Sequence, residues 1–146
     1  MSLSNAAGWV SSGSALSGSL ALSLLASSPA LSQQPGLAAP NLVLRESVTG
    51  MPKSDTQEMR VLTARFNPGD KTVFHTHRSP VTVYVLEGKF TLELEGRAPL
   101  VIAAGQAYVE PPDVKMTGYN KSAREPLSVV IFYVSETGTP FLDPVR

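Results

Sequence analysis

Residues 42–146 are predicted to form one all-β domain. Apolar and polar side chains alternate there with a period of two, which is typical of half-buried strands. Turn-forming residues recur about every 8–12 positions, the spacing found in antiparallel sandwiches and barrels. No stretch of this region carries the i, i+3, i+4, i+7 apolar pattern of an amphipathic helix. The 12 prolines and 11 glycines of the chain also suit a fold with many turns.

Each predicted strand is short and ends at a turn. The first alternates over Met59–Ala64 and stops at the sequence Asn67-Pro68-Gly69. The strands that follow are predicted, in order along the chain, at Thr72–His77, Val81–Leu86, Phe90–Glu95, Leu100–Ala103, Ala107–Val109 and Leu127–Val134. Because free strand edges promote aggregation, we expect these strands to form a closed arrangement.

The first 44 residues contain no Asp, Glu, Lys or Arg. Within them, residues 15–26 form an apolar run that is too short for a membrane-spanning helix, which needs about 20 apolar residues. The run suits the apolar region of a secretory signal, with Ala30-Leu31-Ser32 as a cleavage site, although no Lys or Arg precedes it. Residues 1–32 are therefore predicted to be an export signal or, alternatively, a disordered tail, and residues 33–41 a linker. The first alternative predicts an exported or periplasmic protein and the second a cytoplasmic one, and neither includes a stable membrane anchor.

The charge and cysteine content exclude several functions. The 12 Lys and Arg residues balance 12 Asp and Glu residues, so no long-range positive field attracts nucleic acids. The chain has no cysteine, which excludes disulfides, zinc sites with cysteine ligands and a thiol nucleophile. We therefore expect neither nucleic-acid binding nor thiol catalysis.

The two histidines of the chain, His75 and His77, are separated by one residue. In a strand, residues i and i+2 point to the same face, so both imidazoles are expected to project together. Two neighbouring imidazoles can bind one transition metal ion. On the spacing alone, a pH-sensitive surface pair and a pair of satisfied core side chains remain alternatives.

The residues around the histidines resemble the first sequence motif of the cupin family, which runs glycine, five residues, His-x-His, three or four residues, glutamate, six residues, glycine. Gly69, His75, His77 and Gly88 occupy matching positions. A second stretch resembles the second cupin motif, which runs glycine, five residues, Pro-x-Gly, two residues, histidine, three residues, asparagine. It matches at Gly105, Pro111 and Asn120, while Asp113 replaces the turn glycine. The resemblance covers about residues 42–135 and implies a single-domain cupin jelly-roll β-barrel.

Two of the four positions that hold metal ligands in the family differ in this chain. Val81 stands in place of the glutamate, and Met116 stands in place of the third histidine. The resemblance implies that His75 and His77 hold a transition metal ion inside the barrel, such as Zn, Fe, Ni, Mn or Cu, unless the degenerate site has lost its metal. Met116 either adds a soft thioether ligand, which favours copper(I), or fills the apolar interior. Glu110 is expected in a turn at the rim of the barrel and not as a replacement ligand.

Two functions of different kinds follow from the resemblance, since fold alone does not decide function. One is a metal-dependent enzyme, such as a dioxygenase or isomerase acting on a small organic molecule, whose catalytic residues the sequence does not identify. The other is a non-catalytic module that binds a small molecule in a degenerate, metal-free pocket. Six aromatic residues are candidates for lining such a pocket, or for the core: Phe74, Tyr84, Phe90, Tyr108, Tyr119 and Phe132. Since cupins often pair through edge strands, we also expect a homodimer, with Leu42–Thr49 as the exchanged edge strand.

Overall fold

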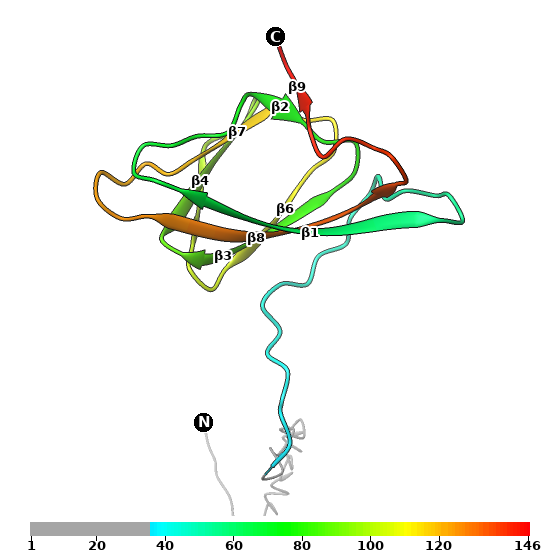
Figure 1. The fold of residues 1–146 in the computed structure, drawn as a ribbon, viewed down its shortest axis with the longest axis horizontal. Coiled ribbons are helices and arrows are strands. Elements are labelled where there is room, and N and C mark those ends of the chain that lie inside the picture. The colour runs from blue at the N-terminus through cyan, green and yellow to red at the C-terminus, as the bar shows by residue number, and fades with distance from the viewer. Residues whose placement is uncertain (1–35) are drawn as a thin grey trace, which may run out of the picture. The chain divides into compact units, whose positions relative to one another are not determined.

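The computed structural model describes residues 36–146 of the chain, which are coloured in Figure 1. The predicted export signal or disordered tail, residues 1–32, lies outside the described residues. Pro40–Arg146 form one compact unit. In the described part of the chain, no helix is long and apolar enough to cross a membrane.

Residues 36–146 contain nine strands, which pair antiparallel in two sheets (Figure 1). The four-stranded sheet has the order β1 (Gln57–Phe66), β8 (Leu127–Glu136), β3 (Val81–Glu87), β6 (Ala107–Glu110). The five-stranded sheet has the order β5 (Leu100–Ala103), β4 (Lys89–Leu94), β7 (Met116–Tyr119), β2 (His75–Thr76), β9 (Asp143–Pro144). All consecutive strands except β4 and β5 lie in opposite sheets, as in a jelly roll. The prediction of an all-β jelly-roll barrel is therefore confirmed.

Six of the predicted strands are present with somewhat different ends, as β1, β3, β4, β5, β6 and β8. The strand predicted at Thr72–His77 is reduced to the two residues of β2, and the Val73 carbonyl just before it accepts a hydrogen bond from the His75 ring. In the single chain Leu42–Thr49 forms no strand, and its role as an edge strand exchanged between two copies stays a prediction. Leu44 and Val48 of this segment line a groove with Phe132 over the outer face of the four-stranded sheet. We call residues 40–51 the N-terminal arm.

Strand β7 was not predicted, because its sequence Met-Thr-Gly-Tyr is short and does not alternate. Its glycine is required by close packing, since a Cβ at Gly118 would lie 2.4 Å from two ring carbons of the core residue Phe90. The loop before β7 contains Asp113, which takes the place of the turn glycine in the cupin motif. Asp113 has a φ of 58°, in the left-handed region that favours glycine and that Asp tolerates better than most residues. The turn geometry is thus kept although the glycine is lost.

The space between the sheets is apolar at one end and more polar at the other. The apolar end is filled by large buried side chains, among them Phe66, Val85, Phe90, Leu127 and Val129. At the other end, four residues lie opposite one another across the four-stranded sheet, in the order Arg60, Tyr133, Val81, Glu110. Because directly opposite residues share a face, this cross-strand row points into the barrel. It forms one wall of the functional site.

Candidate metal and ligand site

His75 and His77 lie beside each other inside the barrel, with exposed fractions of 5% and 1%. Their Nε2 atoms are 3.1 Å apart. The Nδ1 atom of His75 lies 2.7 Å from the carbonyl oxygen of Val73, and that of His77 lies 2.7 Å from the carbonyl oxygen of Phe141. A carbonyl oxygen only accepts hydrogen bonds, so each Nδ1 donates, and each Nε2 of a neutral ring carries a lone pair. The structure therefore brings together two fixed imidazoles with adjacent ligand atoms.

The charge state of His75 is set mainly by its burial. Burial lowers the pKa of His75 below its ordinary value, because an imidazolium is poorly solvated inside the barrel. The hydrogen bond to Val73 raises the pKa of the same ring, the neighbouring His77 lowers it and Glu110 raises it, but the net direction is downward. The lowered pKa favours the neutral ring of His75, in which Nε2 carries the lone pair that a metal ion needs. An Nδ1–H held by a backbone carbonyl is also the usual support of a metal-ligating histidine.

Glu110 does not lie at the rim, and the prediction that placed it there is wrong. Its exposed fraction is 5%, and its Oε2 atom lies 3.2 Å from Nε2 of His77. The reason is the strand register. Glu110 is the last residue of β6 and lies opposite Val81 of β3, whose side chain is fully buried, so the carboxylate shares the inward face.

The two substituted motif positions, Val81 and Met116, are both fully buried. Val81 lies in the cross-strand row between Tyr133 and Glu110. Met116 lies opposite His75 in the register of β7 and β2, and its side chain belongs to the hydrophobic core cluster. The packing therefore accounts for Met116 as a core residue, whether or not its sulfur also contacts a metal.

Tyr133 is a polar residue of the site that the sequence did not reveal. Its ring is fully buried, 6.0 Å from the His77 ring between centroids, and its hydroxyl has no hydrogen-bond partner in the described part of the chain. The alternation of β8 could have identified Tyr133, because Tyr133 and the neighbouring Phe132 must point to opposite faces of the sheet. Phe132 was one of the six aromatic residues predicted to line a pocket or the core, but its exposed fraction is 44% and it faces outward.

The segment of residues 137–146, which we call the C-terminal segment, covers this end of the barrel (Figure 1). The ring of Phe141 packs 5.1 Å from that of His77 and 5.7 Å from that of Tyr133, between centroids. Farther along, Asp143 accepts two hydrogen bonds from Arg78, at 2.7 and 2.9 Å. These hydrogen bonds lower the pKa of the exposed Asp143 carboxyl. The segment thus closes the barrel over the histidines and is held there by contacts outside the site.

The donor atoms at this end fit a metal ion in type and spacing. Two ligands that are each about 2.0–2.1 Å from one zinc ion lie about 2.9 Å apart at a right angle and about 3.3 Å apart at a tetrahedral angle. The distances of 3.1 Å between the two Nε2 atoms and 3.2 Å from His77 to Glu110 fall in this range. Within residues 36–146, however, no three His, Cys, Asp or Glu side chains are already arranged as a metal site. The three donors form a chain centred on His77, and a common site requires a side-chain adjustment.

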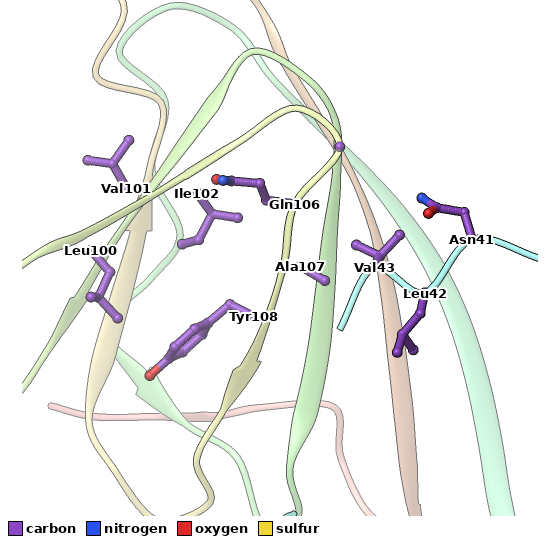
Figure 2. Close-up of a pocket in the computed structure, with 10 residues that line it drawn as sticks. Asn41, Leu42, Val43, Leu100, Val101, Ile102, Gln106, Ala107 and Tyr108 are labelled. Atoms are coloured by element: carbon purple, nitrogen blue, oxygen red, sulfur yellow. The ribbon is translucent and has the colours of Figure 1, made fainter. Parts of the chain in front are cut away.

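Other predicted lining residues lie away from the histidines. Phe90 packs in the core against Phe66, and Phe74 is exposed to 44%. Tyr108 lines a surface pocket of about 530 Å³ between β5, β6 and the N-terminal arm. In Figure 2 its ring lies near Leu100, while Leu42 and Val43 of the arm lie on the other side of Ala107. This pocket is separate from the interior site, because neither histidine lines it.

Two antiparallel sheets packed face to face with jelly-roll connections define the class of double-sheet β-barrels. Residues 62–133 match the family model described as "Cupin domain". Together with the fold, this match shows that the chain belongs to the cupin superfamily, as the two sequence motifs predicted. No curated protein matches the sequence.

Several solved structures share the fold. A cupin-like protein from Thermotoga maritima has a TM-score of 0.52 and 20% identity, over 60% of this chain and 64% of that protein. DMSP lyase DddQ from Ruegeria pomeroyi has a TM-score of 0.52 and 15% identity, over 60% of this chain and 43% of the lyase. A conserved protein with a double-stranded β-helix domain from Klebsiella pneumoniae has a TM-score of 0.51 and 21% identity, over 70% of this chain and 92% of that protein. The chain spans less than two thirds of the first two proteins, and at these identities the likeness is one of fold.

Proposed function

We propose that the protein binds a divalent transition metal ion through His75 and His77, and that a small organic molecule binds to this metal inside the barrel. The observation that carries the proposal is the pair of fixed imidazoles. Both Nδ1 atoms donate to backbone carbonyls, so the two Nε2 lone pairs face each other at 3.1 Å. Two facing lone pairs repel each other unless a proton or a cation lies between them, and a metal ion satisfies both.

A metal held here would act as a Lewis acid toward an oxygen atom of the organic molecule. The chain's own residues would bind and enclose that molecule. The Tyr133 hydroxyl is buried next to His77 without a partner in residues 36–146, so it is available to an oxygen atom of the ligand. Phe141 lies over both rings and excludes water from them. Because the fold also occurs in a lyase, this arrangement is compatible with an enzyme acting on a small organic molecule, such as a dioxygenase or isomerase.

The alternative is a metal-free binding module. It is favoured by the contact of His77 with Glu110, which becomes an ion pair if His77 is protonated. A protonated His77 would satisfy the lone pair of His75 or the carboxylate without any metal. Val81 and Met116 are fully buried at two positions that hold metal ligands in the family. Their presence also favours a metal-free module.

Metal analysis separates the two functions. Protein purified without an affinity tag and loaded at pH 8 with Zn, Fe, Ni, Mn or Cu is expected to hold about one ion per chain. The variants His75→Ala and His77→Ala should lose the ion, because each removes one of two fixed nitrogen ligands. Thr76→Ala, at the position between them, is the matched control and should retain it. Wild-type protein that stays free of every one of these metals would sink the proposal and favour the metal-free module.

We also propose, from the sequence of residues 1–32, that the protein is exported. The support is the apolar run of residues 15–26 followed by Ala30-Leu31-Ser32. Mass spectrometry of the protein isolated from its source should then find a mature chain that begins at Gln33. A chain that retains residues 1–32 inside the cytoplasm would contradict this proposal.

A further inference from the structure

We infer that Glu110 supplies the carboxylate ligand of the metal site, from the strand next to the one that carries Val81. This inference rests on the metal site proposed above and defines its donor set. The family motif places the carboxylate on β3, where this chain has Val81. The structure places a buried carboxylate on β6, at the position directly opposite.

The strand register makes this exchange possible. Val81 and Glu110 are direct partners in the antiparallel pairing of β3 with β6. Such partners share one face of the sheet, with Cβ atoms about 4.5–5.5 Å apart. A glutamate side chain is about as long as this separation between the two Cβ atoms. A glutamate on either strand can therefore reach the same region of the barrel. Val81 is fully buried and Glu110 is exposed to only 5%, so both side chains lie in the interior, and Glu110 is the longer of the two.

The surroundings of Glu110 indicate a cation. Its exposed fraction is 5%, and a carboxylate removed from water needs a positive partner or several hydrogen bonds. In the described part of the chain, its side chain contacts Nε2 of His77, at 3.2 Å. Nε2 of His77 also faces Nε2 of His75. A single lone pair or proton on this atom cannot satisfy both His75 and Glu110 at once. The three donors form a chain centred on His77 in the described residues, and an adjustment of the side chains that brings them around one metal ion would satisfy every one of these atoms.

The donor set specifies the kind of metal. Two imidazole nitrogens and one carboxylate form the set typical of non-haem iron(II) sites, with open coordination positions for other ligands. Manganese(II) and zinc(II) also accept these donors, whereas copper(I) prefers soft sulfur ligands. The inference thus places Met116 in the core and not among the ligands. The organic molecule expected at this site is one that binds through its oxygen atoms to an iron, manganese or zinc ion.

A swap of the two cross-strand positions tests the inference. Four proteins are compared with wild type by calorimetric titration with Mn²⁺ and with Zn²⁺ at pH 8: Glu110→Gln, Glu110→Gln with Val81→Glu, Val81→Glu alone, and Met116→Leu. Glu110→Gln keeps the size of the side chain and removes its charge, so we expect metal affinity to fall at least about tenfold. The double variant returns the carboxylate from the neighbouring strand and should recover most of that affinity. Met116→Leu is the matched buried control and should bind as wild type does.

The outcomes separate this inference from the proposed function. Wild-type protein that binds neither metal contradicts the proposed function itself. Wild-type affinity in Glu110→Gln, together with loss of binding in His77→Ala, overturns only the role of Glu110. Binding that is lost in Met116→Leu also overturns the inferred donor set. Circular dichroism of each variant verifies folding. If Glu110→Gln does not fold, Glu110→Asp replaces it, since aspartate keeps the charge but has a shorter side chain. A smaller loss of metal affinity is expected for Glu110→Asp.

Discussion

At the scale of single residues, the site is defined by two imidazoles that backbone carbonyls hold in place and by one buried hydroxyl without a partner in residues 36–146. His75 and His77 use their Nδ1 hydrogens on backbone carbonyls, which leaves Nε2 of each ring for another contact. Tyr133 keeps a buried hydroxyl without a partner in residues 36–146. A buried hydroxyl that makes no hydrogen bond destabilises the folded state, so its presence suits a group reserved for a ligand.

Replacement of Tyr133 by phenylalanine should stabilise the ligand-free protein by about 1 kcal/mol, since it removes the unsatisfied hydroxyl and keeps the ring. Chemical denaturation measures this difference. Phe66→Leu, a substitution in the apolar end of the core, is the control and should destabilise the protein. A loss of stability in Tyr133→Phe would mean that the hydroxyl makes a hydrogen bond in the folded protein and is not free for a ligand.

At the scale of elements, the C-terminal segment packs against the histidine site. It is held by contacts along its length: Arg60 donates to the Thr139 carbonyl at 2.8 Å, and β9 pairs with β2. Phe141 lies between these two anchors and packs on His77. We therefore expect a molecule that reaches His77 from this end to displace the Phe141 ring, while the two anchors keep the rest of the segment in place.

Truncation of Phe141 to alanine should make a bound metal easier to remove. In protein loaded with Zn²⁺, the rate of zinc transfer to a chelator should rise several-fold, because the ring no longer covers His77. Stability should fall by about 1–3 kcal/mol, less than for a fully buried phenylalanine. Leu142→Ala, the next partly buried residue of the segment, is the control. Equal transfer rates in the two variants would show that Phe141 does not close the site.

The strands and the site residues differ in how well the sequence predicted them. Strong alternation identified β1, β3, β4 and β8, and the His-x-His spacing identified the two imidazoles. Strand β7 escaped prediction because Gly118 interrupts any apolar pattern, and its need for a glycine comes from Phe90, a contact between distant residues. Glu110 escaped because its burial depends on the register of β6 with β3, which the residues around it do not reveal. Local pattern thus predicted the strands, while pairing between strands decided the site.

At the scale of the whole molecule, the outer face of the four-stranded sheet is apolar. Met59 and Val61 of β1 are exposed to 71% and 60%, and Phe132, the cross-strand partner of Val61, is exposed to 44%. The N-terminal arm lies over part of this face and leaves an apolar groove of about 320 Å³. Contiguous exposed apolar patches commonly mark interaction sites. We therefore assign the interface of the expected homodimer to this face.

We predict that a second copy of the chain covers this face. Light scattering coupled to size-exclusion chromatography should give the mass of a dimer for wild type and of a monomer for Val61→Lys, because a buried unpaired charge opposes association. Val101→Lys is a matched control, since Val101 of β5 is exposed to 61% on the other sheet. A monomeric wild type at about 100 μM, or equal behaviour of the two variants, would contradict this prediction.

The central claim is that one metal ion lies between His75 and His77, and its most direct test is anomalous diffraction. Crystals of the metal-loaded protein are measured on both sides of the absorption edge of that metal. One strong anomalous peak is expected inside the barrel, about 2.0–2.3 Å from Nε2 of each histidine. A peak at the protein surface, or an interior in which His77 contacts only Glu110 and His75 with no peak between them, would contradict it.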